Sequence, residues 1–257
     1  KEYLLKRITE GPFSNPNASH HLGRKNLTAM ENSRSLCAKI LGAKPGQLTF
    51  NSGSTEGLST VFHSILLEAK NFGKDIIITS SIEHSAVTNN AKEYQNRGYQ
   101  HKVVETNRQG IIDIDQLKTL IDEHRGQIAL ISLMAANNET GILQPYKEFA
   151  QLCRKENIPF LCDATQLIGK SNFSFSDSGV DYAVLSGHKL GALSGSGILL
   201  SRDSATLKPL IIGGGQERSK RGGTQHYIGH ETLAVALDAF EKNKHQLKDL
   251  RDKRDEF

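Results

Sequence analysis

The sequence is poor in cysteine and has no long hydrophobic run. Its three cysteines, Cys37, Cys153 and Cys162, form no C-x-x-C pair and lie within apolar helix or strand patterns. Buried, reduced thiols are therefore expected, and a reducing, cytoplasmic location fits them best. No apolar run approaches the roughly 20 residues of a membrane span, and no secretory leader is recognisable, so we expect no membrane partner.

Segments with charge of one sign are also missing. The 32 basic and 28 acidic residues are interspersed and give a net charge of +4. Without a polybasic segment, nucleic acid is not expected as a stable partner. Repeats, low-complexity tracts and linkers are absent too, and no metal-binding residues are predicted. With 257 residues and 37% hydrophobic content, the chain favours one large α/β domain over two.

The sequence does contain a regular alternation of strand and helix patterns. Short apolar strands are predicted at residues 48–50, 75–79, 101–104, 128–133, 160–163, 181–185 and 197–201. Amphipathic helices fall between them, and the helix after Ser54, with Ser54 or a neighbour as its N-cap, presents one apolar face made by Leu58, Val61, Phe62, Ile65 and Leu66. The alternation predicts an α/β fold with a mainly parallel seven-stranded sheet and helices on both faces.

The most informative stretch is Ser186-Gly187-His188-Lys189, directly after a predicted strand. A lysine just past a buried strand can be desolvated, which makes its amine a better nucleophile toward an aldehyde. Upstream, Asp163 and Gln166 follow another apolar strand. A pyridoxal phosphate enzyme needs a carboxylate to keep the pyridine nitrogen protonated and a lysine to bind the aldehyde, so this pair predicts pyridoxal 5'-phosphate as the cofactor.

Three further turns follow predicted strands in the same way. The turn around Thr55 could hold a phosphate at a helix N-terminus, although an ordinary capped turn would explain it equally well. His84 could lie flat on an aromatic ring, and Asn138 falls where α/β sheets bind ligands; a surface histidine and a simple turn are the alternatives. Together with Asp163 and Lys189, these residues would be presented along one sheet edge as a single ligand site.

Residues 213–224 form an unusual segment with five glycines and four charged residues. This composition argues against a strand or a helix, because glycine weakens both. A flexible surface loop is one interpretation. The density of arginine, glutamate and glycine favours a shaped interface instead.

The ordered set of motifs resembles the cysteine desulfurases, the NifS-like branch of the class V aminotransferase-fold pyridoxal phosphate enzymes. The matching segments are Asn15-Pro16 with His20 and Gly23, residues 52–56, Glu83-His84, residues 137–141, residues 163–166, residues 186–189 and residues 213–224. The resemblance covers the chain from about residue 12 to the final helix. It implies the large domain of the aspartate aminotransferase-like fold and pyridoxal 5'-phosphate as the cofactor.

The resemblance also implies a role for each matching residue. Lys189 would bind the cofactor aldehyde and move protons at the substrate α-carbon, Asp163 would pair with the pyridinium nitrogen, and His84 would stack on the ring; these three are the expected catalytic residues. Asn138 would help to hold the substrate carboxylate. The remaining expected cofactor contacts are Ser54, Thr55, Gln166, Ser186, His188 and Thr224, the last from the second subunit of a homodimer.

By the same resemblance, the parent reaction would release sulfur from L-cysteine. It would give L-alanine and an enzyme persulfide that is passed to an acceptor, such as an iron–sulfur scaffold protein. Two features depart from the family pattern: residues 190–197 replace a Tyr-Gly-Pro-type turn, and no cysteine follows Lys189, where the family carries its nucleophile. Cys162 should point into the core, so the chain alone is expected to bind the cofactor without desulfurating.

The resemblance suggests how the chain is divided. Residues 1–230 are expected to form the cofactor-binding large domain without its usual first segment. Residues 231–257 would form a long helix leading toward an absent small domain that carries the substrate-binding arginine, and one face of this helix would hold Leu233, Leu237, Phe240, Leu247 and Leu250. The rival interpretations are another class V enzyme, namely a transaminase or a kynureninase-like lyase, and a non-catalytic dimerising fragment. A scaffold, however, has no use for a lysine that binds an aldehyde.

Overall fold

A seven-stranded sheet forms the centre of the protein, for which the computed structural model describes residues 1–247, 252–253 and 256. The strands are β1 (Leu48–Asn51), β2 (Ile76–Ser80), β3 (Gln100–Val104), β4 (Ile128–Met134), β5 (Phe160–Asp163), β6 (Tyr182–Ser186) and β7 (Gly197–Ser201). Their order is β1-β7-β6-β5-β4-β2-β3, and only the pairings of β7 with β1 and β6 are antiparallel among the described strands. The predicted fold class is confirmed.

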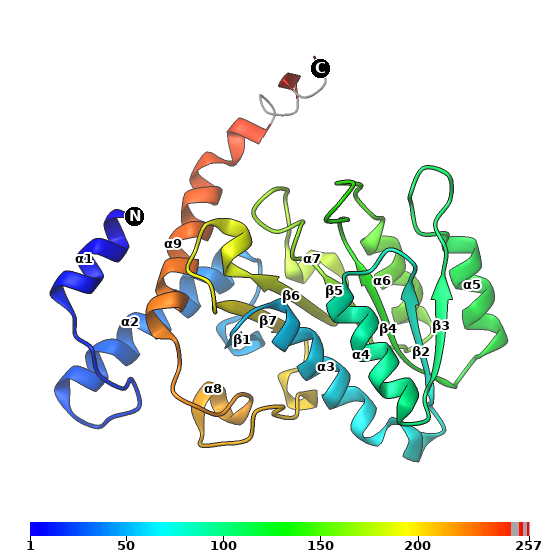
Figure 1. Cartoon of the computed structure of the whole chain (residues 1–257), viewed down its shortest axis with the longest axis horizontal. Helices are drawn as coiled ribbons and strands as arrows, with labels where there is room; N and C mark the ends of the chain where they lie inside the picture. Colours follow the sequence, from blue (N-terminus) through cyan, green and yellow to red (C-terminus); the bar gives the residue numbers. More distant parts are fainter. Residues whose placement is uncertain (248–251, 254–255, 257) are drawn as a thin grey trace.

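Helices cover both faces of this sheet (Figure 1). They are α1 (Glu2–Glu10), α2 (His21–Ile40), α3 (Ser54–Ala69), α4 (Ser85–Asn96), α5 (Ile114–Glu123), α6 (Tyr146–Lys155), α7 (Phe175–Ser178), α8 (Gln216–Ser219) and α9 (Tyr227–Asn243). In the described part of the chain, no helix combines the length and the apolar character that crossing a bilayer requires.

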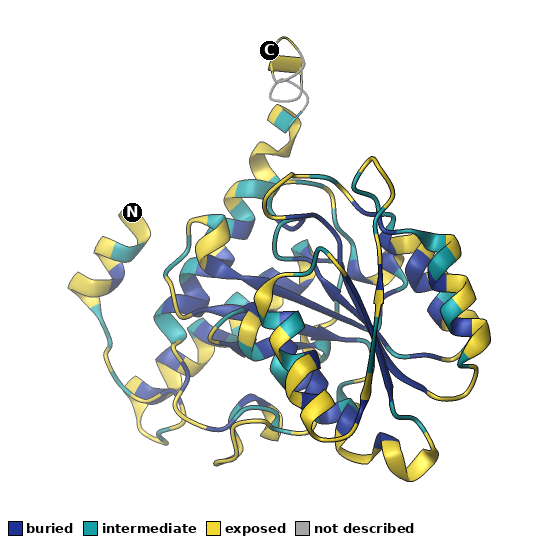
Figure 2. Cartoon of the chain, turned by 45° about the vertical axis from the view of Figure 1, so that its right-hand side comes forward, coloured by how far each residue is buried: buried dark blue, intermediate teal, exposed yellow. Residues whose placement is uncertain are grey.

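The alternation of side chains along the strands divides the core into two layers. Leu161 and Val184 point to the face covered by α3 and α4, where they join one buried cluster. Their neighbours Phe160, Cys162 and Leu185 point to the other face and pack with α2, α5, α6 and α9. Figure 2 shows buried strands in the middle of the sheet, with exposed residues on the outer faces of the helices, on the loops and on the edge strand β3.

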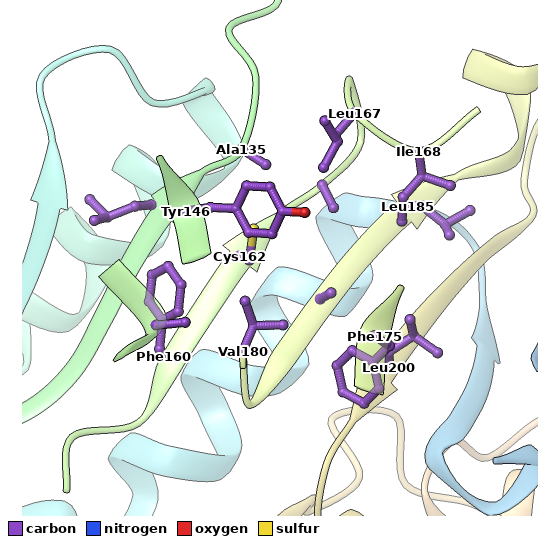
Figure 3. Close-up of a cluster of buried hydrophobic side chains, with 14 of the residues drawn as sticks. Ala135, Tyr146, Phe160, Cys162, Leu167, Ile168, Phe175, Val180, Leu185 and Leu200 are labelled. Atoms are coloured by element: carbon purple, nitrogen blue, oxygen red, sulfur yellow. The ribbon is translucent and has the colours of Figure 1, made fainter. Parts of the chain in front are cut away.

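Cys162 lies inside the second layer, as the sequence predicts. Figure 3 shows its sulfur among Tyr146, Phe160 and Val180, which are all buried. The neighbouring residue Asp163 therefore points to the opposite face of the sheet, because successive side chains of a strand alternate. One strand thus sends a thiol into the core and a carboxyl group toward α3.

The N-terminus of α3 has its cap at a neighbour of Ser54, one of the positions that the sequence allows. Ser54 is the first residue of the helix and not its N-cap; the cap position is Gly53, with φ 151°. The Ser54 N–H is satisfied from outside the helix, because it donates to Ser186 Oγ over 2.8 Å. Gly53 also packs tightly on Gly197 of β7, where an added Cβ would lie 2.5 Å from the Gly53 Cα.

The last long helix begins earlier than predicted. Helix α9 starts at Tyr227, before the predicted position 231, and a 3₁₀ turn follows at Lys244–Gln246. It packs on α2 and α1, where Glu231 forms an ion pair of 2.8 Å with Arg7. Its His230 ring stacks on Phe50 of β1 with 4.2 Å between ring centroids. Leu250, the last predicted residue of the apolar face, lies outside the described residues.

Candidate active site

The predicted site residues meet in one cavity at the sheet edge where β2, β4, β5 and β6 end. The cavity has a volume of about 430 Å³ and is lined by Ser54, Thr55, Leu58, His84, Ala86, Met134, Ala136, Asn138, Glu139, Asp163, Thr165, Gln166, Ser186, His188 and Lys189. Every predicted cofactor contact except Thr224 belongs to this set. The strand ends therefore bring together side chains that are far apart in the sequence.

One end of the cavity is the N-terminus of α3. Ser54 and Thr55 open this helix, and Ser186 reaches it from the end of β6. Backbone N–H groups of a helix N-terminus carry partial positive charge and favour a bound anion. Hydroxyl groups and a helix N-terminus in one place are a donor set that suits a phosphate group.

A continuous chain of hydrogen bonds runs from this end to the carboxyl group of Asp163. Ser186 Oγ donates to Ser54 Oγ over 3.0 Å, and Ser54 Oγ lies 2.6 Å from Thr165 Oγ1. Thr165 Oγ1 in turn donates to Asp163 Oδ1 over 2.5 Å. Thr165 was not among the predicted site residues, although it stands between Asp163 and Gln166 in the same motif. Its position two residues after Asp163 could have indicated a local hydrogen bond to that carboxylate.

Asp163 ends β5 and is 7% exposed. Burial raises the pKa of its carboxyl group, and the hydrogen bonds from Thr165 oppose that rise. Both of these bonds reach Oδ1, and no described residue donates to Oδ2. A protonated pyridine nitrogen beside Oδ2 would supply the missing cation, so this group fits the ring of pyridoxal phosphate.

His84 stands at the mouth of the cavity, at the N-cap of α4. Its Nδ1 accepts a hydrogen bond of 3.1 Å from the Ala86 N–H. An accepting Nδ1 carries no proton, so this contact assigns the proton of the neutral ring to Nε2. The cap therefore fixes both the orientation and the tautomer of the ring that faces the cavity.

Lys189 lines the cavity but is exposed, in the 3₁₀ turn Gly187–Leu190 after β6. The expectation that burial desolvates its amine is wrong, because this turn carries the side chain beyond the buried sheet edge. The turn is held by hydrogen bonds from Gly187 N to Ser196 O (2.8 Å) and from Ala192 N to Gly187 O (3.0 Å). His188, on the same turn, is exposed as well and also lines the cavity.

A second lysine approaches the same wall of the cavity. Lys170 Nζ donates to Gln166 Oε1 over 3.0 Å. Burial lowers the pKa of Lys170, and the charge of Lys189 lowers it further. Sequence reasoning did not single out Lys170, because no strand end or motif marks it.

Of the two asparagines after β4, one organises the turn and the other lines the cavity. Asn137 is 8% exposed and organises the turn, since its Oδ1 accepts from Glu139 N and Thr140 N, each over 2.9 Å. Asn138 lines the cavity, and its Nδ2 donates to Glu139 Oε1 over 2.6 Å. Asn138 is therefore the one available to a ligand, as the sequence predicts.

Thr224 is exposed and lies outside this cavity. Two ion pairs hold the segment that carries it: Glu217 with Arg34 at 2.8 Å, and Arg221 with Glu56 at 2.9 Å. The segment includes the one-turn helix α8, in which Glu217 and Arg218 have left-handed φ values of 49° and 56°. The segment is a shaped loop fixed to the domain, and the contact of Thr224 with a second subunit stays a prediction.

The three cysteines lie away from the cavity. Cys37, Cys153 and Cys162 are free and buried. Burial raises the pKa of Cys37 to about 12, and burial likewise raises the pKa values of Cys153 and Cys162. All three thiols are therefore protonated and shielded, which is the opposite of what a nucleophilic cysteine requires.

Comparison with known proteins agrees with this geometry. The family model "Aminotransferase class-V" matches residues 7–248. The cysteine desulfurase IscS of Dictyoglomus turgidum is 34% identical over 252 residues, which cover 96% of this chain and 63% of the relative. The cysteine desulfurase IscS of Rickettsia prowazekii is 39% identical over 217 residues, covering 82% of this chain and 52% of the relative.

Solved structures give the same result. A NifS-like protein superposes with a TM-score of 0.89 at 34% identity, covering 96% of this chain and 66% of that one. SspA in complex with cysteine superposes with a TM-score of 0.85 at 32% identity, covering 92% and 68%. The chain spans less than two thirds of the length of the two IscS relatives. It belongs to the class V aminotransferase family, within the NifS-like, cysteine desulfurase-like group of pyridoxal phosphate enzymes.

Proposed function

We propose that this chain is the cofactor-binding part of a cysteine desulfurase, whose whole protein converts L-cysteine to L-alanine and a persulfide on an enzyme cysteine. The observation that carries the proposal is the single cavity in which Lys189, Asp163 and His84 lie together. The relatives named cysteine desulfurases and the solved complex of SspA with cysteine support the choice of substrate. Residues 1–230 would hold the cofactor, with α9 leading toward a further domain.

Each residue of the cavity has a separate role in this proposal. Bound there, pyridoxal phosphate supplies an electron sink for the substrate α-carbon. The Asp163 carboxylate would keep the ring nitrogen protonated, and His84, oriented by its contact with Ala86, would lie against the ring. Lys189 Nζ would hold the aldehyde of the cofactor, and its amine would serve as the base for the substrate α-proton. Ser54, Thr55 and Ser186 hold the phosphate at the N-terminus of α3.

Carbon–sulfur cleavage requires a thiolate that reaches the substrate sulfur. Because Cys37, Cys153 and Cys162 are buried and protonated, we propose that the nucleophile is a different cysteine and that this chain alone labilises the α-proton without releasing sulfur. The further proposals are a homodimer with Thr224 contacting the phosphate in the other subunit, a sulfur-accepting protein as partner, and a reducing, cytoplasmic location.

Exchange of the substrate α-proton tests the cofactor chemistry directly. The chain loaded with pyridoxal phosphate is incubated with L-alanine in deuterated water, and loss of the α-proton signal is followed by NMR. Wild type should exchange, and Lys189→Ala should not. Accumulation of pyruvate from L-alanine would instead favour the transaminase alternative.

Borohydride reduction followed by peptide mapping identifies the lysine that binds the aldehyde. The label should appear on Lys189, and Lys170→Ala is the matched control because the Lys170 amine donates to Gln166, a residue that lines the cavity. Label on Lys170 in the wild type would contradict the assignment. Sulfide assays with L-cysteine, on this chain and on a longer one that carries a further cysteine, then separate α-proton chemistry from desulfuration.

A further inference from the structure

Glu83 is a carboxyl group enclosed behind the cavity, one residue before His84. Its Oε1 accepts hydrogen bonds from Ser80 Oγ (2.5 Å) at the end of β2 and from Met134 N (3.0 Å) at the end of β4. Its Oε2 is buried, and no described residue is its hydrogen-bond partner. The residue does not line the cavity, so its carboxyl group contacts protein and not the ligand space.

Among the described residues, the charge that acts on this carboxyl group is negative. Asp163 acts on it from the end of β5, and the Cys162 thiol is close enough for Glu83 to affect it in turn. A buried carboxylate that has no cation and sits beside a second carboxylate is strongly disfavoured. Burial raises the pKa of Glu83 to about 8, and the charge of Asp163 adds to the rise against the two donated hydrogen bonds.

Glu83 lies in the turn that carries His84, and its carboxyl group connects this turn to a neighbouring strand. The turn between β2 and α4 carries His84 to the cavity, and Glu83 ties this turn to β4 through Met134. A second tie comes from Asn137, whose Nδ2 donates to the Ile82 carbonyl over 3.2 Å. Met134 lines the cavity and stands next to Asp163 in the register of β4 and β5. Glu83 thus connects the element that carries His84 with the strand beside Asp163.

We propose that Glu83 is a positioning residue that works as a neutral acid: its carboxyl group joins the ends of β2 and β4 and fixes the turn that carries His84, without placing a second negative charge beside Asp163. Its effect on cofactor binding rests on the proposed function. The protonated state itself belongs to the folded chain and can be measured without any cofactor.

Infrared difference spectroscopy on the cofactor-free chain tests the protonated state. The wild-type minus Glu83→Gln spectrum at pH 6 should show the carbonyl band of a protonated carboxylic acid, and this band should disappear as the pH rises through about 8. Ser80→Ala removes a hydrogen bond that favours the charged form, so the midpoint should move to higher pH. Absence of the band at pH 6, or a midpoint that Ser80→Ala leaves unchanged or lowers, would overturn the proposal.

Cofactor affinity tests the positioning role. Gln has the shape of Glu, is neutral at every pH and keeps Oε1 as an acceptor, so Glu83→Gln should bind pyridoxal phosphate within about threefold of wild type at pH 7. Above pH 8 a charged Glu83 would stand beside Asp163, so the affinity of wild type should decline there and that of Glu83→Gln should not. Glu83→Ala leaves Ser80 and Met134 without their acceptor and should weaken binding by roughly tenfold or more.

These outcomes separate the two proposals. Equal losses of cofactor affinity in Glu83→Gln and Glu83→Ala would mean that the charged form of Glu83 is needed, and the neutral-acid assignment would be wrong. If no variant or wild-type chain binds the cofactor, the proposed function fails, while the infrared titration still decides the state of Glu83.

Discussion

Thr165 donates two hydrogen bonds to the same oxygen of Asp163: its Oγ1 lies 2.5 Å and its backbone N 3.0 Å from Asp163 Oδ1. These bonds stabilise the charged form of a carboxyl group whose pKa burial raises. Ser54 Oγ lies 2.6 Å from Thr165 Oγ1, so the threonine can accept one hydrogen bond while it donates another. The ionisation of Asp163 is therefore controlled from the α3 side of the cavity.

Replacing Thr165 by Val should raise the pKa of Asp163 further, because the variant loses the hydroxyl donor and keeps the backbone N–H. The folded state of Asp163 already binds its proton more tightly than the unfolded state, whose ordinary pKa is 3.8. The free energy of unfolding of the cofactor-free chain therefore falls as the pH rises from this value through the folded pKa. In Thr165→Val that fall should extend to higher pH.

Thr165→Ser is the matched control, since it keeps the hydroxyl group. Urea unfolding at several pH values gives the free energies, and titration with pyridoxal phosphate gives the affinity. We expect Thr165→Val to bind the cofactor about tenfold more weakly, the effect of losing one hydrogen bond to a charged group. If the free energy of unfolding had the same pH dependence in Thr165→Val and Thr165→Ser, the hydroxyl group would not act on Asp163.

The ion pair between Arg34 and Glu217 should hold the 213–224 loop in place. Both side chains are buried, with exposed fractions of 3% and 1%, and Glu217 also accepts from Phe50 N over 2.9 Å. Arg34→Met would leave Glu217 as an uncompensated buried charge, which should reduce the free energy of unfolding by about 3–5 kcal/mol. The double variant Arg34→Met/Glu217→Gln should recover part of the loss.

Arg97 provides the comparison for this measurement. It pairs with Glu93 at 2.8 Å on the surface of α4, where both side chains are more than half exposed. Solvent screens such a pair, so Arg97→Met should change the stability little. Urea unfolding of all the variants gives the free energies. If Arg34→Met and Arg97→Met had equal effects, the buried pair would not be what fixes the loop.

The sequence predicts the strand ends better than it predicts the contacts between them. Apolar runs followed by polar turns locate His84, Asn138, Asp163 and Lys189, because a strand that is buried on both faces must be apolar and its functional side chains must come after it. The alternation within β5 likewise placed Cys162 in the core. These are local patterns, which a single sequence shows directly.

The errors and omissions involve partners that are distant in the sequence. Ser54 or a neighbour was expected to cap α3, and Gly53 holds that position, but the partner of the Ser54 N–H is Ser186, far along the chain. The amine of Lys189 was expected to be desolvated, but Lys189 is exposed on a turn held by Ser196. Glu83 and Thr165 were not assigned roles, because their significance depends on hydrogen bonds to Met134 and Asp163 that only the folded sheet brings within reach.

Gly197 should not tolerate a side chain. An alanine Cβ at this position would lie 2.5 Å from Gly53 Cα and 2.8 Å from Gly53 N, and backbone atoms cannot move aside as a flexible side chain can. Gly197→Ala should lower the free energy of unfolding by about 1–3 kcal/mol or more. It should also weaken cofactor binding, because Gly53 directly precedes the first turn of α3.

Gly46→Ala is the control for this substitution. A Cβ at Gly46 would meet nothing within 4 Å, and this glycine is not among those with positive φ. The free energy of unfolding of Gly46→Ala should equal that of wild type or exceed it slightly, since alanine restricts the unfolded chain. Urea unfolding and pyridoxal phosphate titration compare the two variants. Normal cofactor binding by Gly197→Ala would show that the close approach of β7 to Gly53 does not shape the phosphate end of the cavity.

The three cysteines should be unreactive in the folded chain. Cys37, Cys153 and Cys162 are fully buried, and burial raises the pKa of each thiol, so neither access nor thiolate is available. A thiol reagent such as Ellman's reagent should label none of them in native buffer at pH 8 and all three in urea. Rapid native labelling of one cysteine would identify an accessible thiol and reopen the question of the nucleophile.

Two assays on the cofactor-loaded chain with L-cysteine test whether one of these thiols is the nucleophile: exchange of the substrate α-proton, and formation of sulfide and persulfide. If the nucleophile is none of these three residues, α-proton exchange should proceed while sulfide and persulfide stay at background. Cys162→Ala should leave the exchange rate within about threefold of wild type, roughly 0.7 kcal/mol in barrier, because its sulfur lies on the opposite face of β5 from the cavity. Loss of sulfide release in Cys162→Ala, from a wild type that does release it, would place the reacting thiol inside the core of this domain and contradict the proposed division of roles.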